Sequence, residues 1–347
     1  MNDRINLIAI CFLLVLFSAC QQSSQKVVPD VSGINVDLKI DRFEQALFSI
    51  DTSRLEEGLA ELEKRFPEFS EVYFKYVLGS KDEEVAPEGH LAYMRGFLSH
   101  PGLIHLYDTC LQVYPNLNEI EAELEQAMRF YKYYFPNEEV PHFTTFISEY
   151  SIAAFIYPEN ALGIGLDFFL GADYPYWKYN PQNPNFSDYM VRTNNRDHLV
   201  SKAIQPLIED HLGEAPGERL LDLMIHNGKK LYIRDLLIPY APDTVLLEMT
   251  PLQVQWLKDN EFNIWTHFIG EKLLYSSEFR KIRKLVDYSP TGPSDMPPEA
   301  PGRMGNWIGW QIVKRFMVQH PTMSVQELID LRNSQLILEE SKFKPRH

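Results

Sequence analysis

The pattern of hydrophobic and polar positions is most informative between His142 and Leu212. The first part of this stretch is rich in β-branched and aromatic residues, and the turn sequence at 157–160 divides it, which predicts two strands. The second strand has a bulky face of Leu162, Ile164, Leu166 and Phe168, and a nearly bare face of Ala161, Gly163, Gly165 and Asp167. Glycine inside a strand often marks a close approach by a ligand or another backbone. We therefore expect the bare face to border either a cleft or a tightly packed helix.

A helix is predicted from Asp197 to Leu212, with Asn194 or Asn195 as its N-cap. Its apolar face comprises Leu199, Ala203, Leu207 and Ile208. A bare strand followed by a helix is the layout of a zincin-type metallopeptidase. The pattern therefore predicts a zincin-like core.

The rest of the chain is mostly helical in pattern. Alternation of apolar and polar residues at 34–41 predicts one half-buried strand. Capping signals, among them a capping box at 53–56, and apolar stripes predict helices near 53–62, 90–113, 118–135, 217–239, 251–274 and 311–319. Just before the last of these, Gly305 and Gly309 place two small residues on one face, which permits close packing. The predicted fold class is α+β, predominantly helical with a small β-sheet and a zincin-like, degenerate metallopeptidase-like core.

The amino-terminal residues predict where the protein resides. The apolar run from Ile5 to Phe17 is too short to span a bilayer and is typical of a signal-peptide core. It ends in the sequence LFSAC at 16–20, which resembles the bacterial lipobox and implies cleavage after Ala19 and acylation of Cys20. The alternative is an ordinary signal peptide that contains a cysteine. Stable anchoring requires two or more lipid chains, at ~0.8 kcal/mol for each buried methylene, and lipoprotein acylation would meet that need.

These features predict three parts of the chain. Residues 1–19 are expected to be the lipoprotein signal peptide, and residues 20–33 a lipidated N-terminus and polar tether. Residues 34–347 are expected to form a single large α+β domain. Within it, the helical region covers about 41–136 and the zincin-like core about 140–340.

The composition of the chain argues against some classes of function. The net charge is -15 and there is no cluster of Lys and Arg, which argues against nucleic-acid binding and against adhesion to anionic lipid. Hydrophobic residues make up 45% of the chain, enough for a large core. Once Cys11 is removed and Cys20 acylated, Cys110 alone remains, so no intrachain disulfide can form, and its place on a helical stripe predicts a packed core thiol.

The chain lacks the signature of zinc hydrolysis. A zinc pair on a helix requires two histidines at i and i+4, with a glutamate to activate water. The residue four positions after His198 is Lys202, the residue four positions before His211 is Leu207, and no HExxH occurs anywhere. Nucleophile-elbow, P-loop and dinucleotide-binding motifs are missing too. We therefore expect no catalytic residues, no metal ligands and no cofactor.

An alternative metal site is conceivable from spacing alone. Glu218, Asp222 and His226 follow one another at intervals of four residues, and His267 and Glu271 repeat that interval. Such helix faces are more often solvated or paired in ion pairs.

Two segments are candidate partner-binding regions. The proline-rich loop at 287–303, which contains Pro297 and Pro298, is either a lid or partner-binding arm or an inert connector. The aromatic stretch at 174–179, which contains Tyr176 and Trp177, could bind glycan or an extended peptide by stacking, or could simply pack in the fold.

Several motifs together carry a family resemblance. These motifs are the lipobox, DLKIDRFEQALFSID, ALGIGLDFFLG, AIQPLIEDHLG and PGRMGNWIGWQIVKRFM. In combination they resemble the gliding motility-associated lipoprotein GldB family over essentially the whole mature chain. The central and late motifs are also similar to predicted zinc peptidases, in which a downstream helix supplies glutamate before glycine. Here that position is Asn227. The resemblance implies a fold that persists without the catalytic apparatus.

The resemblance also implies a function. It predicts a non-enzymatic, palmitate-bearing cell-envelope lipoprotein required for gliding motility, which assembles or supports the gliding and secretion apparatus through contacts with other envelope proteins. The absence of an acidic cluster after Cys20 favours the periplasmic side of the membrane. The alternative is a divergent zinc metallopeptidase that acts on envelope proteins.

Overall fold

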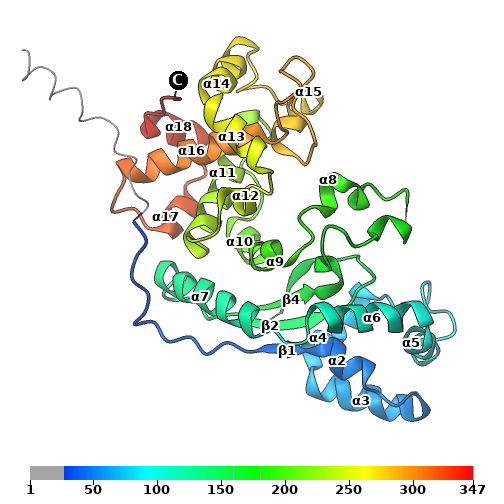
Figure 1. Cartoon of the computed structure of the whole chain (residues 1–347). Helices are drawn as coiled ribbons and strands as arrows, with labels where there is room; N and C mark the ends of the chain where they lie inside the picture. The colour runs from blue at the N-terminus through cyan, green and yellow to red at the C-terminus, as the bar shows by residue number, and fades with distance from the viewer. Residues whose placement is uncertain (1–26, 159, 180, 347) are drawn as a thin grey trace, which may run out of the picture. The chain divides into compact units, whose positions relative to one another are not determined.

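The computed structural model describes residues 27–158, 160–179 and 181–346 (Figure 1). The predicted signal peptide and Cys20 lie outside the described residues. Residues 27–33 contain a turn but no helix or strand. The structure is 57% helical with one small sheet, which confirms the predominantly helical α+β class. Within the part of the chain that the structure describes, no helix is long and apolar enough to cross a membrane.

The sheet has four short strands in the order β1-β2-β4-β3. They are β1 (Ile40–Arg42), β2 (His142–Phe146), β3 (Ala154–Tyr157) and β4 (Ala161–Gly165). β2 pairs in parallel with β1 and β4, whereas β3 is antiparallel to β4. The predicted strand at 34–41 is therefore correct in its burial, since Val36, Leu38 and Ile40 are buried, but only the last residues pair with a neighbour.

Six α-helices connect β1 to β2. They are α2 (Phe43–Phe48), α3 (Leu55–Arg65), α4 (Pro67–Val72), α5 (His90–Ser99), α6 (Pro101–Val113) and α7 (Asn118–Tyr134). The predicted helix at 90–113 is divided because Pro101 cannot donate the backbone hydrogen bond that would continue α5. The predicted capping box at Ser53 is also wrong, because the Asp51 side chain caps this turn by accepting from the Ser53 backbone. Cys110 is a buried free thiol on α6, as predicted, and burial raises its pKa strongly.

The bare face of β4 is covered by neighbouring side chains and backbone. A Cβ added to Gly163 would lie 2.8 Å from the Phe155 ring, and one added to Gly165 would lie 2.2 Å from the carbonyl oxygen of Ile152. The expected cleft is therefore absent at these two glycines, because Phe155 of β3 and the loop before β3 fill that space. A helix covers this face only indirectly, since Phe69 of α4 packs on Phe155. The strand also ends at Gly165, since residues 166–169 form a 3₁₀ turn.

Asp167 in that turn is fully buried and holds the loop before β3. Its Oδ2 accepts hydrogen bonds from the backbone N–H groups of Ser148, at 3.1 Å, and Tyr150, at 2.6 Å. These bonds hold two consecutive residues, Glu149 and Tyr150, in the left-handed region at φ 54° and 62°. Burial raises the pKa of Asp167 to about 7, against the opposing effect of the two backbone donors.

The single helix predicted at 197–212 is two short helices, α9 and α10, in the structure. After α8 (Asp188–Val191), α9 (Arg196–Ala203) begins at the predicted N-cap Asn195, whose side chain accepts from the His198 backbone. The predicted helix 197–212 is divided because Pro206 interrupts the hydrogen-bond ladder at the start of α10 (Gln205–Leu212).

Eight further helices form the carboxy-terminal part. They are α11 (Leu220–Leu237), α12 (Asp243–Leu246), α13 (Pro251–Asp259), α14 (Glu261–Gly270), α15 (Phe279–Val286), α16 (Met304–Gln319), α17 (Val325–Asp330) and α18 (Ser334–Ser341) (Figure 1). Thr250 forms the predicted N-cap of α13, with a complete capping box. The predicted helix 251–274 divides at Asn260.

The close packing predicted from the glycine spacing is confirmed in α16. A Cβ added to Gly309 would lie 1.7 Å from the carbonyl oxygen of Met224 in α11, and one added to Gly228 in α11 would lie 2.4 Å from the carbonyl carbon of Gly309. The two backbones therefore touch where these glycines cross. Around the crossing, Met224, Ile308 and Trp310 are buried in the same hydrophobic core.

Candidate functional site

The most unusual group of side chains surrounds the buried residue Glu248. The Glu248 cluster comprises Arg192, Lys202, Arg234, Glu248, Tyr288 and Arg303. The carboxylate of Glu248 accepts a hydrogen bond from the Tyr288 hydroxyl at 2.9 Å. Its oxygens also lie 4.0 Å from Lys202 Nζ and 3.8 Å from Arg234 Nη1. A single acidic side chain that is only 3% exposed is thus shared by groups from several helices.

The backbone of Glu248 binds two further cations. Its carbonyl oxygen accepts hydrogen bonds from Arg192 Nη2 at 2.7 Å and from Arg303 Nη2 at 2.9 Å. Glu248 and Arg303 both have left-handed backbones, with φ of 52° and 59°. Non-glycine residues take this conformation rarely, and here the hydrogen bonds hold both in place. The cluster therefore connects α9, α11, the segment before α13 and the start of α16.

The electrostatics of the cluster favour an ionised Glu248. Burial alone would raise the pKa of the carboxyl, but Lys202, Arg303 and Arg234 outweigh it and lower that pKa. The pKa of Lys202 is lowered by burial, against the opposing attraction of Glu248. Four cationic side chains thus surround Glu248, two at its carboxylate and two at its backbone carbonyl oxygen. A divalent cation placed here would be repelled by that excess of positive charge.

Of the helix positions where zinc ligands would be expected, Lys202 lies in the Glu248 cluster. Lys202, four residues after His198, donates to Thr193 Oγ1 at 2.9 Å and lies in the Glu248 cluster. His198 instead contacts Asn195 Oδ1 at 2.9 Å, and burial lowers its pKa. His211, on α10, contacts the Tyr131 hydroxyl at 2.9 Å. Each of these side chains thus has a packing or hydrogen-bonding role in α9 or α10.

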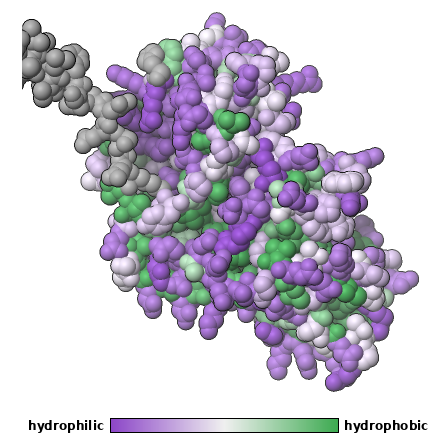
Figure 2. Space-filling view, in the orientation of Figure 1, coloured by the Kyte–Doolittle hydropathy of each residue, from purple (hydrophilic) through white to green (hydrophobic). Residues whose placement is uncertain are grey.

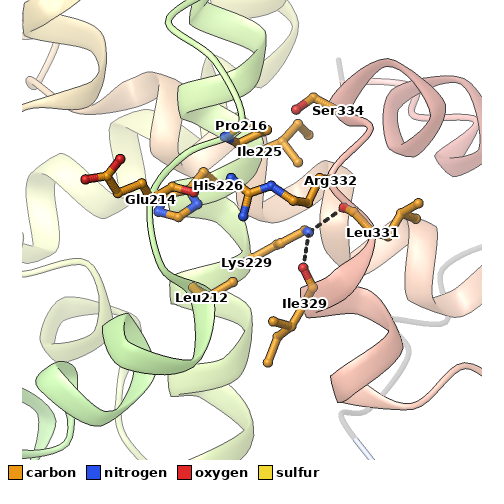
Figure 3. A pocket seen from close by; sticks show the side chains of 10 residues that line it. All are labelled: Leu212, Glu214, Pro216, Ile225, His226, Lys229, Ile329, Leu331, Arg332 and Ser334. Carbon is orange, nitrogen blue, oxygen red and sulfur yellow. Dashed lines mark hydrogen bonds between the residues drawn. The ribbon is translucent and has the colours of Figure 1, made fainter.

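The alternative metal site at 218–226 does not assemble as the spacing predicted. Glu218 precedes the first residue of α11 and is exposed, while Asp222 is bound by Arg219 at 2.8 Å. His226 lies in a small pocket with Lys229 and Arg332 (Figure 3). Burial and the nearby cations Lys230, Lys229 and Arg332 lower the pKa of His226 to about 4. Across residues 27–158, 160–179 and 181–346, no three His, Cys, Asp or Glu side chains are grouped closely enough to hold a metal ion.

Lys229, in the same pocket, has a structural partner. Its ammonium donates to the carbonyl oxygens of Ile329, at 3.4 Å, and Leu331, at 2.7 Å (Figure 3). These carbonyls lie at the end of α17, where helix carbonyls lack partners and a cation is favourable. Burial lowers the pKa of Lys229 to about 8. The pocket therefore ties α11 to α17.

The remaining candidate ligands are also engaged elsewhere. His267 Nε2 lies 3.6 Å from Asp295 Oδ2 in the proline-rich loop, rather than in a pair with Glu271. Asn227, at the position where the similar peptidases have glutamate, donates to Asn306 Oδ1 at 2.9 Å and so joins α11 to α16.

The predicted partner-binding residues differ in accessibility. Tyr176 is 1% exposed, and its hydroxyl donates to the Phe168 carbonyl and accepts from the Leu170 N–H. Its assignment to partner binding is wrong, because a buried ring cannot stack on a partner. Trp177 is 57% exposed, and Pro297 and Pro298 are exposed as well. Figure 2 shows hydrophobic residues in separate patches among hydrophilic ones on the face in view.

Sequence reasoning missed the Glu248 cluster as a unit. Its members are spread from Arg192 to Arg303, and none belongs to a local motif. The only signal at Glu248 itself is a single acidic residue in the apolar sequence VLLEMT at 245–250.

The comparisons with known proteins agree with the resemblance in the sequence. The family described as gliding motility protein GldB matches residues 24–345. The chain belongs to this family, and it is therefore a gliding motility-related protein. Neither the comparison with curated proteins nor the comparison with solved structures gives a significant match. The zincin-like character of the core stays a prediction.

Proposed function

We propose that the protein is a non-enzymatic cell-envelope lipoprotein that assembles or supports the gliding and secretion apparatus through protein contacts. Three features support the proposal. The family is that of a gliding motility protein, and the sequence LFSAC at 16–20 provides a lipidation site at Cys20. The helices that follow the sheet carry Lys202 and Leu207 at the spacings where a zinc enzyme requires histidines.

The observation that carries the non-enzymatic part is the Glu248 cluster. Lys202 occupies the i+4 position from His198 and lies in a group of four cationic side chains around the single acidic residue Glu248. Zinc catalysis requires about three protein ligands and a base beside bound water. A buried group with excess positive charge provides neither. The cluster instead stabilises the arrangement of the helices.

The proposed protein contacts involve exposed groups on two irregular segments. Trp177 offers a large aromatic surface, of the type enriched at interfaces. Pro297 and Pro298 lie in a loop with a restricted backbone, which loses less entropy when it binds. We propose that partners of the gliding machinery contact these residues, and that the lipid on Cys20 holds the protein at the membrane, facing the periplasm.

The variant Cys20→Ser tests the anchor on which this function depends. We expect it to lose palmitate labelling, to leave the membrane fraction or remain unprocessed, and to abolish gliding, because the protein no longer stays at its partners. Cys110→Ser is the matched control, since Cys110 is a buried thiol that does not belong to the LFSAC sequence. Unchanged labelling and gliding in Cys20→Ser would contradict the proposal.

A further inference from the structure

A hollow of about 580 Å³ lies between α7, α9 and the segment that joins α11 to α12. We call it the α7–α9 groove. It is lined by one face of α7, by residues 196–201 of α9 and by residues 237–245. The candidate partner residues Trp177, Pro297 and Pro298 are not among the residues that line it.

The interior of the groove is mainly apolar. Ala127, Val200 and Val245 are buried side chains on its floor. Tyr240 on its edge is 74% exposed, with its ring centroid 6.3 Å from that of Phe130. Pro239 and Pro242 flank this tyrosine, and proline restricts the backbone. The aromatic edge is therefore held in place before any partner arrives, which reduces the entropy lost on binding.

The polar part of the groove is acidic. The side chains of Glu119 and Glu123 are 90% and 54% exposed, and Asp197 is also exposed. The cation among them, Arg196, binds Glu123 at 2.7 Å and lies 3.9 Å from Glu119. Burial lowers the pKa of His198, which keeps this imidazole neutral at pH 7. Three carboxylates against one guanidinium leave the groove negatively charged.

We propose that the α7–α9 groove binds a polypeptide segment of another envelope protein, with apolar side chains next to Lys or Arg. The apolar floor takes the hydrophobic side chains, and the carboxylates select the basic ones. A second copy of this chain fits poorly, because each copy carries a net charge of -15 and the two repel. Anionic lipid headgroups are repelled by the same carboxylates. This inference rests on the proposed function and adds the site and chemistry of one contact.

A displayed library of random peptides, panned on the full-length mature protein in detergent, tests the groove. Enriched peptides should combine Leu, Ile or Phe with Lys or Arg, and their binding should weaken as salt is added. Tyr240→Ala should weaken the binding of labelled enriched peptides by about tenfold or more, as expected for loss of a large aromatic contact. The pair Glu119→Lys and Asp197→Lys should weaken it similarly, by reversing the local charge.

Controls come from exposed residues outside the groove. Tyr76→Ala removes a ring that is 68% exposed, and Glu83→Lys reverses an exposed charge; both should leave peptide binding unchanged. Failure to enrich basic apolar peptides, or binding that Tyr240→Ala leaves intact, would overturn the groove assignment. If either occurs while Cys20→Ser still abolishes gliding, the groove assignment fails and the proposed function stands.

Discussion

Glu248→Gln is expected to destabilise the protein by about 3 to 5 kcal/mol, the range found when one partner of a buried ion pair is removed. The substitution keeps the size of the side chain but leaves Lys202 and Arg234 without a negative partner in a buried site. Arg192 and Arg303 would then add to the repulsion, because they are held at the carbonyl of the same residue. Urea unfolding at neutral pH measures the change in the free energy of unfolding.

The effect of Glu248→Gln should depend on pH. The folded-state pKa of Glu248 lies below its ordinary value of 4.5, so the ionised carboxylate contributes stability above that value. This contribution is lost as the pH falls through the lower, folded-state pKa. The difference between the natural protein and the variant should therefore be largest at neutral pH and shrink in acid.

Glu278→Gln is the matched control for Glu248→Gln. Glu278 forms an exposed ion pair with Lys281 at 2.8 Å, and such pairs contribute about 0 to 1 kcal/mol. Equal unfolding free energies for the two variants would mean that the Glu248 cluster does not stabilise the arrangement of the helices.

Gly309→Ala should also destabilise strongly, by about 3 kcal/mol or more, at or beyond the upper end of ordinary overpacking. The added Cβ would lie 1.7 Å from the carbonyl oxygen of Met224. That oxygen belongs to the backbone of α11 and cannot rotate away, so α11 and α16 must separate. Their separation would expose part of the core around Ile308 and Trp310. Thermal unfolding monitored by circular dichroism measures the loss.

Gly96→Ala is the matched control, and it should change the stability of the protein in the opposite direction. Gly96 lies within α5, and a Cβ there would meet nothing within 4 Å. Alanine should therefore stabilise the helix by about 0.5 to 1 kcal/mol, because glycine loses more conformational freedom on folding. Equal melting of Gly309→Ala and the natural protein would show that the two backbones are not in contact.

The sequence predicted those features whose causes are local. The cap at Asn195, the capping box at Thr250 and the small face of Gly309 each depend on a few neighbouring residues, and all three are present. Helix ends at Pro101 and Pro206 were missed because apolar periodicity continues across each proline. Local patterns therefore identified the elements better than their boundaries.

Features that depend on distant residues could not be predicted. The covering of Gly163 requires Phe155 from another strand, and the pattern around Gly163 gives no sign of it. Tyr176 and Trp177 belong to the same aromatic stretch, and nothing in the sequence distinguishes them. In the structure the hydroxyl of Tyr176 donates to the carbonyl of Phe168 and its ring is buried. The Glu248 cluster depends on contacts between residues up to 56 positions apart, so only the fold brings its members together.

The metal content of the mature protein, purified in detergent without chelator, tests the central claim most directly. That claim is that the protein acts through contacts and not through zinc catalysis, with Lys202 in place of a histidine four residues after His198. Elemental analysis is predicted to find no stoichiometric zinc, because Lys202 and its neighbouring cations repel a divalent ion. Stoichiometric zinc, together with a peptidase activity that is lost with the zinc in His198→Ala or in His226→Ala, would contradict the claim.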